Sequence, residues 1–241
     1  MKKIALCMLI LGLNPVFWAE AQQNAKYDAV TSSQALAVQA GINADVQNIG
    51  SQSDKDEASE EVYSSLSLNR IIEDHELVAV VRDRDRCQFT PDIEDRARLV
   101  QLPVFMFAWG DMLVNGVCVK KDEKLGLSYI EKAADNAYGP ALERLSFYYE
   151  KGFLVSRNKA LSERYMHTSA VLGSKSGRLG WADMLVRGFG TPSMYEEAFG
   201  WLYHADYHDE YSKLKQRYLE KELKQRLPPE VIARSQQLNY N

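Results

Sequence analysis

The sequence has few of the residues that hold metals or build common catalytic sets. Only three cysteines and four histidines occur among 241 residues, and no Ser/His/Asp set, Cys/His set or nucleotide-binding motif stands out. Basic residues do not exceed acidic ones, 29 against 33, and the net charge of −4 gives no reason to expect nucleic-acid binding. Beyond the N-terminus, no apolar run approaches the ~20 residues that span a membrane. We therefore expect no catalytic, cofactor or metal site, and a function in binding other proteins.

The N-terminus has the pattern of a secretory signal peptide. Two lysines precede the apolar run "IALCMLILGL", and Ala19-Glu20-Ala21 matches the small–x–small cleavage pattern. We expect cleavage after Ala21, so that residues 1–21 are the signal peptide and the mature chain is exported. A membrane anchor is the alternative, although the run is too short to span a bilayer. A lipoprotein cut at Cys7 would leave almost no apolar segment before it.

Removal of the leader leaves two cysteines, Cys87 and Cys118. In an exported, oxidising compartment, one intramolecular disulfide is the default expectation. It would close a loop of about 32 residues. Restricting the unfolded chain in this way stabilises the fold by roughly 3–4 kcal/mol in the chain-entropy model. An intermolecular bridge and two free thiols remain as alternatives.

The region before the repeats divides into two parts. Residues 22–65, with stretches such as "NIGSQSDKDEASEE", contain few large apolar residues and are predicted to be a flexible tether, with ordering on a partner as the alternative. Residues 66–102 are predicted to be N-terminal docking helices, because "SLNRIIEDHELVAVV" has a helical apolar pattern. Thr90 resembles an N-cap with Pro91 at the first helical position.

One octet occurs twice. "WGDMLVNG" at Trp109–Gly116 and "WADMLVRG" at Trp181–Gly188 share six of eight residues at an offset of 72, and "LSFYYEKG" keeps the pattern midway. Three glycines mark a period of 36 residues, and further columns of small and aromatic residues follow it. The glycines are Gly116, Gly152 and Gly188; the small residues are Gly110, Ser146 and Ala182; the aromatic residues are Tyr129, Tyr165 and Trp201.

Each unit is predicted to be a pair of helices. The glycine ends helix A, since it can adopt the positive φ that a helix C-terminus often needs, and the aromatic column lies on helix B. A period of this length indicates a helical solenoid whose units must stack to bury their apolar faces. We expect an all-α fold with three repeats in residues 103–208, in which the Trp and Met residues of the octets form core and not a ligand cage.

The unit resembles the Sel1-like repeat, a relative of the TPR. "YIEKAA" (Tyr129–Ala134) matches its helix B, and its second turn glycine corresponds to Gly190. In the first unit that position is Cys118. The resemblance implies that Cys118 can reach a segment packed beside the N-terminal end of the solenoid, where Cys87 should lie.

Three further stretches allow a functional interpretation that the sequence favours less than a structural one. His204 and His208 have the i, i+4 spacing of a metal pair, but no third ligand is evident, and His204 occupies a polar column of the repeat. "GSKSG" (Gly173–Gly177) faintly resembles a phosphate loop and lies at a turn between units. Residues 209–241 are predicted to be C-terminal capping helices. Their basic helix, Tyr211–Arg226, has Tyr211, Leu214 and Tyr218 on one face, and a docking surface for an acidic partner is the alternative.

Two longer segments resemble the MotX family of periplasmic polar flagellar motor proteins. They are "CQFTPDIEDRA" (Cys87–Ala97) and "PVFMFAWGDMLVNGVC" (Pro103–Cys118), with "VYS" at Val62–Ser64 in addition. The resemblance implies a non-enzymatic periplasmic protein that joins a MotY-like ring protein at the flagellar basal body and holds stator units through their B-type subunit. It implies no cofactor, no nucleic acid and no stable membrane insertion. An exported adaptor for a periplasmic sensor and a penicillin-binding Sel1-type enzyme are the alternatives.

Overall fold

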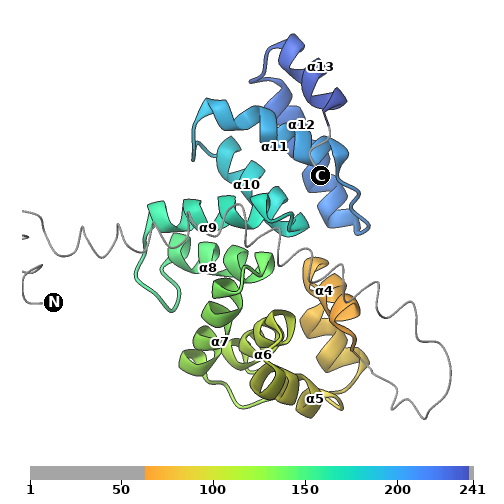
Figure 1. The fold of residues 1–241 in the computed structure, drawn as a ribbon, viewed down its shortest axis with the longest axis vertical. Helices are drawn as coiled ribbons and strands as arrows, with labels where there is room; N and C mark the ends of the chain where they lie inside the picture. The colour runs from red at the N-terminus through yellow and green to blue at the C-terminus, as the bar shows by residue number, and fades with distance from the viewer. Residues whose placement is uncertain (1–62, 239–241) are drawn as a thin grey trace, which may run out of the picture. The chain divides into compact units, whose positions relative to one another are not determined.

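The computed structural model describes residues 63–238 (Figure 1). The predicted signal peptide and residues 22–62 of the predicted tether lie outside the described residues. Every regular element between residues 63 and 238 is a helix or a helical turn. The expected all-α class is therefore confirmed for this part of the chain.

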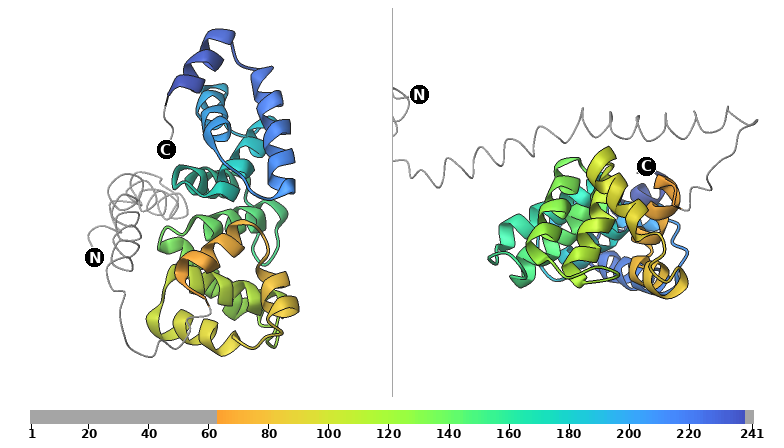
Figure 2. Two further views of the ribbon diagram at one scale, coloured as in Figure 1. Left: turned by 90° about the vertical axis from the view of Figure 1, so that its right-hand side faces the viewer. Right: turned by 90° about the horizontal axis from the view of Figure 1, so that it is seen from below.

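Six helices form three consecutive pairs with the expected period (Figures 1 and 2). The first pair is α6 (Pro103–Asn115) and α7 (Glu123–Asp135), and the second is α8 (Gly139–Lys151) and α9 (Lys159–Val171). The third is α10 (Lys175–Val186) and α11 (Tyr195–His204). Each A helix packs on its own B helix, and α7 and α9 each pack on the A helix of the next pair. Asp122 and Asn158 begin α7 and α9 as N-caps, because their side chains accept the backbone N–H three residues on.

Small residues allow the two helices of a pair to approach closely. A Cβ atom added to Gly110 of α6 would lie 2.7 Å from the carbonyl oxygen of Gly126 in α7. In the second pair the equivalent contact is a hydrogen bond of 2.7 Å from the Ser146 hydroxyl to the Ser162 carbonyl. The small column at Gly110, Ser146 and Ala182 is thus the line along which helix A meets helix B.

The octet tryptophans and methionines are core residues, as expected. Trp109, Met112, Trp181 and Met184 are all buried. Trp181 and Met184 belong to a continuous apolar cluster that extends into the C-terminal helices. No ligand cage is needed to explain them.

The segment before the repeats packs beside α6. It consists of α4 (Ser65–Glu73), a wide helical turn η1 (Ala79–Arg84), α5 (Thr90–Asp95) and a second wide turn η2 (Arg96–Val100). The N-cap expected at Thr90 is wrong by one residue: Phe89 is the cap, and Thr90 is the first helical residue. The Thr90 hydroxyl is buried without a hydrogen-bond partner, so it does not cap the helix.

Two helices, α12 (Glu210–Lys224) and α13 (Pro229–Gln237), follow the last pair. Leu219 and Leu223 of α12 are fully buried in the cluster that contains Trp181 and Phe199. The face noted in the sequence does not make this contact, because Tyr211, Leu214 and Tyr218 are 65%, 59% and 54% exposed. The helix packs on the last repeat through its opposite face.

Candidate functional site

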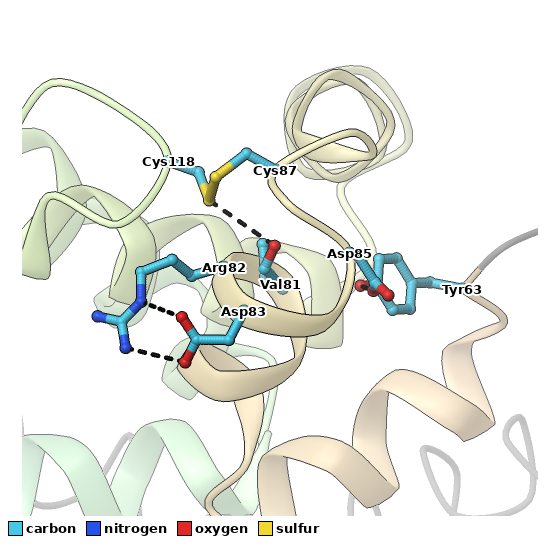
Figure 3. Close-up of a disulfide and its surroundings, with 7 residues drawn as sticks. All are labelled: Tyr63, Val81, Arg82, Asp83, Asp85, Cys87 and Cys118. Atoms are coloured by element: carbon cyan, nitrogen blue, oxygen red, sulfur yellow. Dashed lines mark hydrogen bonds and ion pairs between the residues drawn. A yellow bond between two sulfur atoms is a disulfide. The ribbon is translucent and has the colours of Figure 1, made fainter.

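Cys87 and Cys118 are joined in a disulfide at the N-terminal end of the repeats (Figure 3). Cys87 follows η1, and Cys118 lies in the turn between α6 and α7, with 5.4 Å between the two Cα atoms. The bond connects the segment before the repeats to the first A–B turn. Its formation in the cell stays a prediction, because oxidation depends on the compartment.

Tyr63, the first described residue, is anchored beside this disulfide (Figure 3). Its hydroxyl donates to Asp85, its backbone carbonyl accepts from Arg96 at 3.3 Å, and its ring packs edge-on against Phe89 at 6.1 Å. Burial and the neighbouring Asp85 carboxylate raise the pKa of the Tyr63 hydroxyl. The end of the predicted tether is therefore held against the bridged segment by several contacts.

The turns between the helices of a pair use left-handed backbone at two positions. Gly116 and Gly152 follow directly on α6 and α8 with φ of +67° and +71°, and Gly188 has φ of +88° one residue later, after Arg187. Two residues beyond each glycine, Cys118, Leu154 and Gly190 have φ of 61°, 62° and 62°. The half-cystine therefore occupies a conformation that all three units share.

Ion pairs join the A helices of successive repeats. Asp111 of α6, only 4% exposed, binds Arg144 of α8, and Asn115 donates to the same carboxylate at 3.0 Å. Glu150 of α8 binds Arg187 of α10 through two contacts of 2.8 and 3.2 Å. Arg187 and Lys151 together lower the pKa of Glu150 to about 2. These ion pairs therefore connect the first repeat to the second and the second to the third.

Comparison with known proteins agrees with this architecture. The Sel1 repeat family matches residues 103–138, 139–174 and 178–205. The sodium-type polar flagellar protein MotX of Vibrio parahaemolyticus is 36% identical over 174 residues, which cover 72% of this chain and 82% of that protein. The chain belongs to the MotX family.

A crystal structure of a Sel1 repeat protein from Oxalobacter formigenes matches this MotX-family chain with a TM-score of 0.44 at 15% identity. The match covers 82% of this chain and 86% of the other. This similarity is too low to bear on function.

In this member of the MotX family, α4 also contacts the third repeat. The Glu73 carboxylate accepts from the Ser176 backbone N–H at 3.0 Å and from the Ser174 hydroxyl at 3.2 Å, at the start of α10. Asn69 of α4 accepts from the Tyr138 hydroxyl at 2.8 Å. Burial, with Glu143 nearby, raises the pKa of Glu73 above its ordinary value. The segment before the repeats therefore contacts the start of the third repeat as well as packing beside α6 of the first.

We expect Glu73 to make stability depend on pH. A carboxyl whose pKa is raised by folding stabilises the fold below its unfolded pKa, here 4.5, and that contribution is lost as pH rises through the folded value. Glu73→Gln keeps an acceptor for Ser176 and cannot ionise, so its stability relative to wild type should rise as the pH increases above about 4.5.

Glu73→Ala is the matched comparison, because it removes both accepted hydrogen bonds. It should be less stable than Glu73→Gln at every pH, by about 1–2 kcal/mol. The measurement is urea unfolding followed by circular dichroism at several pH values. Glu143, Tyr138 and Arg178 also lie close to this carboxyl and are left unchanged. A glutamine variant that loses stability relative to wild type as pH rises would contradict the assignment.

The candidate metal pair and phosphate loop have structural partners. The His204 ring nitrogen lies 3.2 Å from the Ser235 carbonyl of α13, and His208 lies near Asp206. Gly173 and Ser174 lie in the turn between α9 and α10, and residues 175–177 are the first residues of α10, which Ser174 caps. Within residues 63–238, no group of three or more His, Cys, Asp or Glu side chains has metal-binding geometry. None of the helices in that range is long and apolar enough to cross a bilayer.

Proposed function

We propose that this protein is a non-enzymatic, periplasmic component of the polar flagellar motor. With a MotY-like ring protein it forms a ring on the basal body and recruits or stabilises stator units through their B-type subunit. The observation that carries the proposal is the 36% identity to a polar flagellar MotX over most of both chains.

The repeats support a role in binding, because stacked helix pairs present an extended surface to other proteins. Exposed aromatic side chains on such a surface are the residues that most often dominate binding energy. In the middle repeat, Phe147 and Phe153 are 49% and 41% exposed, and both rings pack against the buried Tyr148 at 6.2 and 5.2 Å. We propose this pair as a contact for a motor partner.

Deletion of the gene should leave the filament assembled but rotation absent or severely weakened. The reason is that the protein is expected to position stators, so its loss should lower the number of fluorescent stator units at the flagellated pole. Wild-type protein supplied in trans should restore both the count and swimming. Normal stator counts with normal swimming would refute the motor assignment and favour an exported adaptor for a periplasmic sensor.

A Phe147→Ala/Phe153→Ala double variant separates binding from folding in the same assay. Both side chains are substantially exposed, so the variant should keep the thermal unfolding midpoint within a few degrees of wild type. If the pair contacts a partner, the variant should fail to restore the stator count. Leu125→Ala on α7, a residue 44% exposed, is the control and should restore it.

A further inference from the structure

The segments that join helix A to helix B within a repeat are basic. They are residues 116–122, 152–158 and 187–194, which together contain four basic residues and one acidic residue. The segments that join each pair to the next helix contain no lysine or arginine and two aspartates; they are residues 136–138, 172–174 and 205–209. Stacked repeats place equivalent turns along one edge of the solenoid. The edge formed by the A–B turns is therefore positive, in a chain whose net charge is −4.

Contacts between side chains hold the A–B turns of the second and third repeats next to each other. Lys159, which directly follows the second turn, has its ammonium group 4.4 Å from the centre of the Phe189 ring in the third turn. The Arg187 guanidinium lies 5.1 Å from the centre of the same ring and binds Glu150 of α8 at 2.8 Å. The two turns therefore present one continuous surface.

Two cations on this surface lack an acidic partner. Arg157 and Lys159 are exposed, and among residues 63–238 neither has a carboxylate within ion-pair distance. The three carboxylates nearby already have partners within the repeats, which are Lys151 and Arg187 for Glu150, Arg187 for Asp183 and the Gly190 N–H for Glu163. Positive charge on this surface is therefore left to be matched from outside the repeats.

Phe153, in the second turn, is the exposed apolar side chain beside these cations. It is 41% exposed, and its ring packs edge-on against Tyr148 at 5.2 Å, which holds it in place. It directly follows Gly152, and a Cβ atom added to that glycine would lie 3.4 Å from the Arg157 Cβ. A partner that covers Phe153 is therefore brought close to Arg157.

We propose that the A–B turns of the second and third repeats bind an acidic segment of a partner protein. An apolar side chain of that segment lies on Phe153, and its carboxylates pair with Arg157 and Lys159. The inference rests on the role of Phe153 as a partner contact under the proposed function, and it adds the chemistry of the partner. Because Phe153 and Arg157 are neighbours, a single short segment can engage both.

The charges decide between an acidic segment and other occupants. A neutral segment that covers Phe153 would bury Arg157 and Lys159 without partners, which costs free energy, and a basic segment would be repelled. Carboxylates offset that cost through charge-assisted hydrogen bonds. An anionic lipid surface would also satisfy the cations, but binding in a bilayer interface depends on a large apolar face. Here the exposed apolar part is one ring that is held against Tyr148.

The first test measures binding of the labelled peptide Glu-Glu-Asp-Phe-Glu-Asp-Glu to the purified protein by fluorescence anisotropy. Binding should saturate at low salt and weaken as added salt screens the charges. Arg157→Glu/Lys159→Glu should weaken binding at least about tenfold, because both contacts become repulsive. Arg157→Lys/Lys159→Arg keeps both charges and should keep binding. Arg217→Glu/Lys221→Glu on α12 changes the charge of two exposed residues by the same amount and should bind like wild type.

The second test isolates the contact made by the Phe153 ring. Phe153→Ala should weaken binding of this peptide about threefold to tenfold, the usual value of a contact between two aromatic rings. The same variant should bind a peptide with serine in place of the central phenylalanine as well as wild type does, which assigns the loss to the contact between the two rings. Thermal unfolding of every variant is measured first, and the midpoints should stay within a few degrees of wild type because the changed side chains are exposed.

The comparison ligand is a vesicle of equal parts phosphatidylglycerol and phosphatidylethanolamine, to which wild type should not bind. Peptide binding is measured on the purified protein, so it can fail while deletion of the gene still lowers the stator count, and the two proposals are tested separately. Three results would overturn the inference: a wild-type protein that does not bind the peptide, one that binds the vesicles alone, or an Arg217→Glu/Lys221→Glu variant that loses as much affinity as Arg157→Glu/Lys159→Glu.

Discussion

Replacing Cys87 or Cys118 by serine is expected to lower the free energy of unfolding by about 3–4 kcal/mol. The bond spans 31 positions in the sequence, and without it the unfolded chain regains the entropy of that loop. Such a loss is a large share of the 5–15 kcal/mol that usually stabilises a native protein. Variants should also be less abundant in cells, because unfolded chains are exposed to proteases.

The loss should begin in the segment before the repeats. This segment reaches the first A–B turn through the disulfide, and Tyr63 donates a hydrogen bond to Asp85 within the segment (Figure 3). Without the bond, α5 keeps its packing on α6 and η2, and the segment that follows η1 keeps the contact between Asp85 and Tyr63. Hydrogen exchange should therefore increase first around α5 and η1, and later in α8 and α9.

The measurement is urea unfolding of both single variants, of the double variant and of wild type with and without reductant. All variants and the reduced wild type should share one lower midpoint, because each lacks the same bond. Peptide mapping without reduction should recover Cys87 and Cys118 in one linked species. Free thiols at both positions in the protein isolated from its native cells, or single variants as stable as wild type, would show that the bridge does not form.

The repeat could be predicted from the sequence because the residues that make the contacts between helices recur with its period. A glycine, a small residue and an aromatic residue recur every 36 positions. The helix starts recur in the same way: Pro103, Gly139 and Lys175 for the A helices, and Glu123, Lys159 and Tyr195 for the B helices. A local pattern of this kind needs no knowledge of distant parts of the chain.

The orientation of α12 could not be predicted in that way. The helix carries Leu219 and Leu223 on one side and Tyr211, Leu214 and Tyr218 on another, so its apolar pattern supports either face as the buried one. Contact with Trp181 and Phe199 selects the leucines. That selection depends on the shape of the last repeat, which is a property of the fold and not of the helix.

Contacts between distant polar residues were also missed. Glu73 meets Ser176 across 103 positions, and Asp111 meets Arg144 across 33. Neither pair follows the period of 36, and each residue alone resembles an ordinary exposed charge. Asp111 stands in the same octet position as Asp183 of α10, whose partner is Arg187, the residue that directly follows that helix. Sequence identity in the octet therefore hides two different roles for the same residue.

The buried position of Asp111 leads to the second large expected effect. Its side chain is only 6% exposed and is neutralised by Arg144 from the next repeat, whose guanidinium also lies 5.5 Å from the centre of the Phe107 ring. Arg144→Met keeps the apolar stem but leaves a buried carboxylate with Asn115 as its remaining donor of those described here. Breaking such a pair from one side typically costs about 3–5 kcal/mol. We expect a loss near the lower end, because Arg144 is partly exposed.

A double variant separates the cost of a stranded charge from the value of the pair. Asp111→Asn/Arg144→Met removes both charges, so it should recover more than half of the stability that Arg144→Met loses, as measured by urea unfolding. Arg187→Met is the comparison, because Arg187 is 40% exposed and the Glu150 carboxylate, itself 14% exposed, keeps Lys151 at 2.8 Å as a partner after the change. The loss should therefore be smaller, about 1 kcal/mol. If Arg144→Met and Arg187→Met lowered the free energy of unfolding equally, burial of Asp111 would not determine the stability of the contact between the first and second repeats. The expected order, with the double variant between them, would instead show that the repeats are held in register by one buried charge and its partner.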